Sequence, residues 1–257
     1  MHILEHGQGQ EKTLLFLPCT AEPVWAFEKT VALLAQSWHV FQVVYDGHEP
    51  SYPGDFTSVE QTVDEITDYL RAQGVTCLDA AYGCSLGGSF VGLLAARGNI
   101  RMEYGILGSS DLDQSSKFAA KVQTDLLLPL MFPMLRDGRF KSPLLQKRVE
   151  KQMRQMGDYG AAFLRILGGA RPYLTQQSCK NQFYSDLVTP LPDKINVPGT
   201  EIHIFYALKM GEKYRERYER HFANPVIHEQ DLQHEELLAC YPERWVQLVK
   251  DIMEGKQ

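Results

Sequence analysis

The chain has 257 residues, enough to bury a full hydrophobic core as one large domain or as one domain with an insertion. Its hydrophobic content of 44% and charged content of 23% are ordinary for a globular protein, and a net charge of −6 argues against nucleic acid as a main partner. No apolar segment is long enough to cross a bilayer, and the N-terminal residues lack a basic region followed by an apolar core. We therefore expect a cytoplasmic protein with no signal peptide and no membrane partner.

The cysteines give a further constraint. There are five, an odd number, and none of them stand in C-x-x-C spacing. This pattern favours reduced thiols over a disulfide framework or a zinc site. We expect neither a metal ion nor an organic cofactor, and the sequence carries no signal for an oligomeric state.

The first 110 residues alternate between strand and helix patterns. Continuous apolar runs such as Thr13–Leu17 are typical of strands buried on both faces, and apolar residues at helical spacing separate them. The order predicts a doubly wound, mostly parallel sheet with helices on both faces. The expected elements are strands at His2–Glu5, Thr13–Leu17, Trp38–Tyr45, Leu78–Tyr82 and Glu103–Ser110, with helices after Thr20, from Thr57 and after Ser85.

A strand in this series turns directly into a helix at Gly83-Cys84-Ser85-Leu86-Gly87. These residues fit the nucleophile-elbow pattern G-x-S-x-G, in which the central serine occupies a strained turn. Gly83 and Gly87 remove side chains that would clash at such a turn, so that the Ser85 hydroxyl stands over the helix N-terminus. The pattern predicts that Ser85 is a nucleophile, and a helix-capping serine in a glycine-rich turn is the structural alternative.

Residues 111–196 have a different pattern, because apolar segments broken by prolines alternate with a basic amphipathic stretch at Lys141–Met156. We expect this segment to be a mainly helical cap inserted into a core made of residues 1–110 and 197–257. The sheet resumes at Glu201–Ala207, and a charged helix at Gly211–Phe222 follows. A short strand at Pro225–Glu229 and a helix around Trp245 complete the chain.

With its elbow, its strand–helix order, a helical insertion and a histidine just before the last helix, the chain resembles the α/β-hydrolase superfamily. The resemblance implies a catalytic order of nucleophile, acid and histidine along the chain, in which Ser85 and His234 occupy the first and third places. Histidine is the side chain whose pKa suits a general base near neutrality. His234 is thus the candidate base.

The candidate acid is less clearly marked. The position where the resemblance places an aspartate after Glu201–Ala207 is Met210, which cannot orient an imidazole. Glu212 is the nearest carboxylate and the first choice, although it also fits a salt-bridged helix face. Asp111 is the alternative, because some superfamily members take the acid from the preceding strand. Asp113 and Asp231 are more distant candidates.

The resemblance also implies an oxyanion hole built from two backbone amides. One is the amide of Leu86, directly after the nucleophile, and the other is that of Thr20, in the loop after Thr13–Leu17. The expected reaction is cleavage of an ester or related small acyl substrate through an acyl-enzyme on Ser85. An acyltransferase that uses the same nucleophile and a non-catalytic ligand-binding protein on the same fold are the alternatives.

Overall fold

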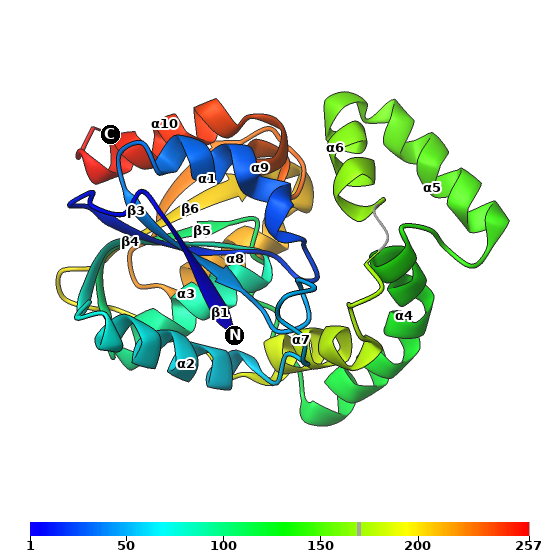
Figure 1. The fold of residues 1–257 in the computed structure, drawn as a ribbon, viewed down its shortest axis with the longest axis horizontal. Coiled ribbons are helices and arrows are strands. Elements are labelled where there is room, and N and C mark those ends of the chain that lie inside the picture. The colour runs from blue at the N-terminus through cyan, green and yellow to red at the C-terminus, as the bar shows by residue number, and fades with distance from the viewer. Residues whose placement is uncertain (169–170, 257) are drawn as a thin grey trace.

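The computed structural model describes residues 1–168 and 171–256, and these form a seven-stranded sheet covered by helices on both faces (Figure 1). The strand order is β1-β3-β2-β4-β5-β6-β7, in which only β1 runs antiparallel to its neighbour. The predicted doubly wound, mostly parallel sheet is confirmed. The strands are β1 (His2–His6), β2 (Thr13–Leu17), β3 (His39–Val44), β4 (Cys77–Cys84), β5 (Arg101–Gly108), β6 (Glu201–Ala207) and β7 (Val226–Gln230).

The helices of the core divide between the two faces of the sheet (Figure 1). On one face, Phe90 and Tyr218 belong to a fully buried cluster packed against β2–β4. On the other face, Trp245 contacts Tyr82 edge-on with 4.6 Å between ring centroids. The first face carries α2 (Val59–Ala72), α3 (Leu86–Arg97) and α8 (Glu212–His221); the second carries η1 (Val24–Phe27), α1 (Glu28–Leu34), α9 (Glu236–Cys240) and α10 (Pro242–Met253).

Four helices form the cap between β5 and β6: α4 (Lys117–Asp137), α5 (Pro143–Gln155), α6 (Gly157–Leu167) and α7 (Gln176–Val188). The expectation that prolines break the first of them is wrong, because α4 continues through both Pro129 and Pro133. Each proline removes one backbone hydrogen bond of the helix. The buried side chains of Leu128, Phe132 and Leu135 anchor α4 on both sides of these gaps.

The sheet gathers several candidate residues at one end. Thr20 follows β2, Ser85 follows β4, Asp111 follows β5 and His234 follows β7, so all four lie beyond the carboxyl ends of parallel strands. Ligands bind in this region of open α/β sheets. Within the described residues, no helix combines the length and the apolar character that a membrane span requires.

Candidate active site

Ser85 occupies the turn between β4 and α3 with φ 50° and ψ −115°. A Cβ atom on Gly83 would lie 2.0 Å from the carbonyl oxygen of Gly87, and one on Gly87 would lie 2.3 Å from the carbonyl oxygen of Leu17. Both positions therefore require glycine. The geometry is that of a strained strand-to-helix turn with the serine at its tip.

Backbone strain is concentrated around Ser85. Six described residues other than glycine have φ in the left-handed region, and five of them follow the carboxyl ends of strands at this end of the sheet. Such strain persists only where the surrounding structure enforces it, and it clusters at functional sites. The five are Ala21 (φ 56°), Ser85 (50°), Ser109 (49°), Leu112 (46°) and Glu235 (62°), and the sixth is Lys194 (56°).

Two cavities meet at Ser85. The first, of about 230 Å³, contains His234 and Glu22 beside Ser85 and is lined mainly by apolar side chains of the cap. The second, of about 170 Å³, contains Asp111, Asp113 and Asp186. Thr20, Ser85, Met131 and Phe183 line both cavities. The apolar side chains of the first cavity are Met131, Met134, Leu135, Phe163, Ile166, Leu167 and Phe183.

The proposed oxyanion donors lie at this junction. Leu86 is the first residue of α3, and the first amides of a helix have no intrahelical acceptor. The residues on either side of Thr20 are bound by side chains through their backbone amides. The amide of Cys19 donates to Glu22 Oε2 at 3.2 Å, and the amide of Ala21 donates to Gln182 Oε1 at 3.1 Å. These contacts hold the Thr20 loop from both sides.

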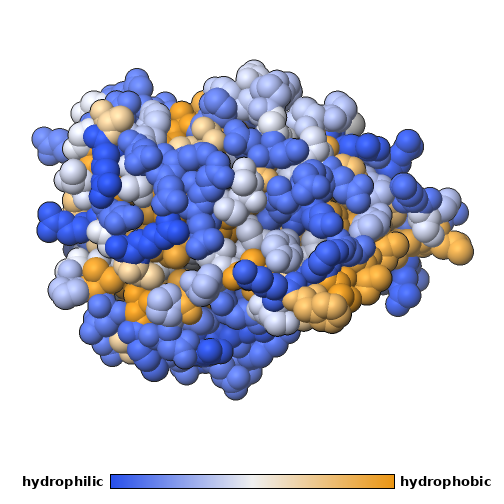
Figure 2. All heavy atoms as spheres, turned by 90° about the horizontal axis from the view of Figure 1, so that it is seen from below, coloured by the Kyte–Doolittle hydropathy of each residue, from blue (hydrophilic) through white to orange (hydrophobic). Residues whose placement is uncertain are grey.

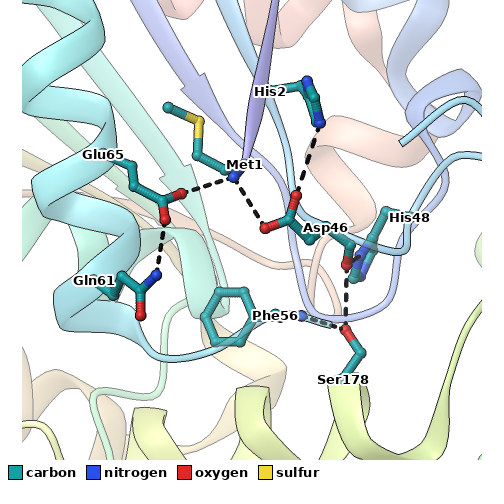
Figure 3. Close-up of polar contacts among 8 residues, drawn as sticks. All are labelled: Met1, His2, Asp46, His48, Phe56, Gln61, Glu65 and Ser178. Atoms are coloured by element: carbon teal, nitrogen blue, oxygen red, sulfur yellow. Dashed lines mark hydrogen bonds and ion pairs between the residues drawn. The ribbon is translucent and has the colours of Figure 1, made fainter. Parts of the chain in front are cut away.

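The Gln182 contact belongs to a buried network that ties the cap to the core. Gln182 Nε2 lies 3.0 Å from His48 Nε2, and His48 Nδ1 lies 3.1 Å from the Asp46 carbonyl oxygen. Burial lowers the pKa of His48 to about 4, so the ring is neutral, donates from Nδ1 and accepts at Nε2. Nearby, the Ser178 hydroxyl accepts from the Phe56 amide and donates to the Asp46 carbonyl (Figure 3).

We expect Gln182→Leu to lower kcat for p-nitrophenyl ester hydrolysis roughly tenfold to hundredfold, because the Thr20 loop loses one of its supports. Urea unfolding should also show a loss of about 1–3 kcal/mol, since the Ala21 amide and His48 Nε2 are left without partners. Gln177→Leu, a change at an exposed position of the same helix, is the control. Equal kcat values for the two variants would contradict a role for the network.

His234 is partly exposed at the rim of the first cavity, with 40% of its side chain accessible. Its Nδ1 atom lies 3.4 Å from Oε1 of Glu235. Asp111 is the second carboxyl group near this ring: burial raises the pKa of Asp111, and the charge of His234 lowers it. Glu235 lines the first cavity together with His234, whereas Asp111 lines the second, and both cavities include Ser85.

The structure places Glu212 away from this pair. Glu212 is exposed at the first position of α8, and no contact joins it to His234 among the described residues. Asp231 is also exposed and contacts Lys209. Of the carboxylates considered from the sequence, Asp111 and Asp113 line a cavity with Ser85.

The helix that begins with Glu212 instead supports the Asp111 loop. Arg217 donates from Nη1 to the Asp111 carbonyl oxygen at 2.9 Å, and its Nη2 lies 2.9 Å from Asp113 Oδ1. The Tyr218 hydroxyl donates to the Ser110 carbonyl oxygen. Arg217 thus neutralises Asp113 and helps to fix the backbone from which the Asp111 side chain projects.

Asp186, on α7, completes the acidic lining of the second cavity. Burial and, to a smaller extent, the charge of Asp111 raise the pKa of Asp186 to about 8, although a hydrogen bond from Ser89 acts in the opposite direction. The Oδ1 atom is buried without a hydrogen-bond partner among residues 1–168 and 171–256. At neutral pH the Asp186 carboxyl group is therefore mainly protonated.

We expect Asp186→Asn to stabilise the protein at high pH. The folded-state pKa lies above the unfolded value, so the native state holds the proton more tightly and stability falls as pH rises from about 4 to about 8. Asparagine removes this penalty, which should raise the free energy of unfolding by about 2 kcal/mol near pH 9 and little near pH 5. Urea titrations at both pH values test this, with the exposed Asp68→Asn as control. A pH-independent effect would be contrary to this expectation.

Two carboxyl groups that line the first cavity, the buried Glu22 and the partly buried Glu235, lie close together. Burial raises the pKa of Glu22 well above its ordinary value, the charge of Glu235 raises it further, and the two side chains share a hydrogen bond. The buried Glu22 carboxyl group therefore favours its protonated form. Neither residue was identified from the sequence. Glu22 stands in an ordinary loop pattern, and Glu235 has only its position after His234 as a signal.

Two cysteines surround this pair. The thiol of Cys84 is buried next to Ser85, and burial raises its pKa to about 11, while that of Cys19 is raised further. Ligand-type atoms of Cys19, Cys84 and Glu235 lie within 4.8 Å of one another. A metal ion at this cluster would have to displace the protons of both thiols. The raised pKa values oppose this exchange and also oppose a role for Cys84 as a second nucleophile.

Comparison with known proteins gives structural relatives at low sequence identity. No family model and no curated protein matches the sequence. A putative α/β hydrolase family protein from Desulfitobacterium hafniense superposes with a TM-score of 0.76 at 16% identity, over 98% of this chain and 100% of that chain. The enol-lactonase from Burkholderia xenovorans LB400 gives a TM-score of 0.68 at 16% identity, over 98% and 96%.

MenH from S. aureus superposes with a TM-score of 0.70 at 13% identity, over 100% of this chain and 98% of that chain. These matches cover the sheet, its helices and the cap in nearly their full length. The chain therefore has the α/β-hydrolase fold, with a helical cap between β5 and β6.

Proposed function

We propose that the protein is a serine hydrolase that cleaves an ester or a related acyl substrate through an acyl-enzyme on Ser85. One observation carries the proposal: Ser85 is held in a strained turn where two cavities meet, with Thr20 lining both cavities and His234 lining the first. A serine that only capped α3 would accept a hydrogen bond from the helix and would not need positive φ. The Ser85 side chain makes no capping bond in the structure.

In the proposed reaction, His234 removes the proton of Ser85 as the hydroxyl oxygen attacks the substrate carbonyl. The amides of Leu86 and Thr20 then donate to the negative oxygen of the tetrahedral intermediate. His234 returns the proton to the leaving group, and the acyl-enzyme forms. Water, activated by His234, attacks the acyl-enzyme in the same manner and releases the acid.

Asp111 is proposed as the acid that orients His234. Glu235 Oε1 lies 3.4 Å from His234 Nδ1, but the Glu235 carboxyl group also shares a hydrogen bond with Glu22, which competes with the imidazole for it. Asp111 shares the second cavity with Ser85, and α8 fixes its backbone. A carboxylate in this role holds the imidazole tautomer and stabilises the imidazolium.

The two cavities suggest how a substrate would lie. The apolar first cavity, of about 230 Å³, suits a short acyl chain, because its cap side is made of methionine, leucine and phenylalanine side chains. The second cavity offers carboxyl, amide and hydroxyl groups from Asp113, Asp186, Gln123 and Thr124. It therefore suits a polar leaving group.

A fluorophosphonate probe tests the proposal, because such probes phosphonylate an activated serine. We expect the native protein to be labelled, Ser85→Ala to remain unlabelled, and His234→Ala to be labelled far more slowly. Mass spectrometry of the labelled peptide should place the adduct on Ser85. A native protein that is folded but unlabelled would overturn the proposal and favour a ligand-binding role on the same fold.

A further inference from the structure

One face of α4 exposes a row of apolar side chains. Phe118, Val122, Leu126 and Leu130 follow one another at four-residue spacing, and their exposed fractions are 79%, 42%, 67% and 64%. The helix buries the opposite face, which includes Leu128. The row is about 18 Å long. Figure 2 shows apolar residues gathered in a band on the side of the molecule where α4 lies in Figure 1.

The segment around this row is strongly basic. Residues 117–156 contain nine Lys or Arg and three Asp or Glu, whereas the chain as a whole has a net charge of −6. Three of the nine pair with a carboxylate within the segment: Lys121 with Asp125, Arg136 with Asp137 and Arg154 with Glu150. For the other six, the described part of the chain provides no ion pair: Lys117, Arg139, Lys141, Lys147, Arg148 and Lys151.

The exposed row also borders the entrance to the candidate site. Leu127, which directly follows Leu126 of the row, is 49% exposed and lines the second cavity. Gln123 is exposed as well and lines the same cavity. The helix that carries the apolar row therefore also forms one wall of a cavity that reaches Ser85.

We propose that this face of α4, together with the basic residues of α5, docks on an anionic lipid surface. A helix binds the interface of an anionic membrane through exposed apolar side chains assisted by basic ones, and this segment of the cap carries both. Self-association through the same face would bring two positively charged segments together, which charge repulsion opposes. The proposal goes beyond the expectation of no membrane partner, which rested on the lack of a membrane-spanning segment; surface binding does not require such a segment.

Vesicle co-sedimentation tests the proposal. The protein should bind vesicles made of equal parts phosphatidylglycerol and phosphatidylcholine, bind pure phosphatidylcholine much more weakly, and dissociate as salt is raised. We expect the double variant Leu126→Asp/Leu130→Asp to lower the partition coefficient about a hundredfold. Lys147→Glu/Lys151→Glu should lower it about tenfold or more. All four positions are exposed, so both variants should keep the native circular dichroism spectrum.

Leu208→Asp is the matched control, because Leu208 is 40% exposed but lies outside the cap. It should bind like the native protein. Binding is independent of the proposed hydrolase function, so Ser85→Ala should also bind normally even if no fluorophosphonate labelling is found. A lack of binding to anionic vesicles would overturn the proposal, as would binding that both aspartate substitutions leave unchanged. A dimer that Leu126→Asp/Leu130→Asp dissociates, without vesicle binding, would assign this face to a second copy instead.

Discussion

Asp111→Asn is expected to lower kcat for ester hydrolysis by about 10³–10⁴-fold with little change in KM. Asparagine keeps the size of the side chain but removes the charge that stabilises the imidazolium, and its amide favours the wrong tautomer of His234. The backbone around residue 111 should stay in place, because Arg217 and Tyr218 bind the carbonyl oxygens of residues 111 and 110. Steady-state kinetics with a p-nitrophenyl ester measure both parameters.

Two control variants separate Asp111 from the other carboxylates. Glu212→Gln should leave kcat within about twofold of the native value, because Glu212 is exposed and away from His234. Glu235→Gln should lower kcat by less than Asp111→Asn, since Glu235 divides its hydrogen bonding between His234 and Glu22. If Glu235→Gln had the larger effect, Glu235 and not Asp111 would be the acid.

The pH–rate profile adds an independent readout. In the native protein, the acidic limb of kcat/KM should report the titration of His234 in the free enzyme. Loss of the Asp111 charge should move this limb to lower pH, because a neighbouring carboxylate favours the charged imidazolium. A merely structural effect of the substitution would lower the rate without moving the limb.

Much of the sheet could be predicted because its strands are buried on both faces. The predicted bounds of Thr13–Leu17 match the observed strand, because four of its five residues are fully buried apolar side chains and such a continuous run is typical of a strand covered on both faces. The cap was harder to predict. The sequence pattern does not predict helix α7, because most of its buried residues are polar or small, among them Ser178, Gln182 and Ser185, and no apolar stripe marks the helix.

The candidate site was predictable where backbone geometry dictates the residue type. Gly83 and Gly87 are required by close contacts, so they leave a pattern around Ser85 that can be found without a structure. Glu22 and Asp186 leave no such pattern. Each is a carboxyl residue in a polar stretch, and its function depends on which segments fold over it. Glu212 shows the same limit of sequence patterns. It is the carboxylate nearest in sequence to the expected position of the acid, but nearness in sequence says little about nearness to His234 in the fold.

The elbow gives the sharpest test of how sequence determines this site. We expect Gly83→Ala to destabilise the protein by about 3–5 kcal/mol and to abolish fluorophosphonate labelling of Ser85. The added Cβ would lie 2.0 Å from the Gly87 carbonyl oxygen and 2.2 Å from its carbon. Both are backbone atoms in the first turn of α3, so no side chain can move to make room, and relief requires β4 and α3 to separate.

Gly92→Ala is the control for this prediction, because Gly92 lies in the same helix but the nearest atoms to its added Cβ are in side chains: Leu191 at 3.1 Å and 3.2 Å, and Phe222 at 3.6 Å. Alanine also favours the helix by roughly 0.5–1 kcal/mol over glycine, so the net change should stay within about 1 kcal/mol. Urea unfolding and probe labelling of both variants measure the two effects. A Gly83→Ala protein with native stability and native labelling would show that the elbow tolerates a side chain. The strained turn would then no longer support the assignment of Ser85 as the nucleophile.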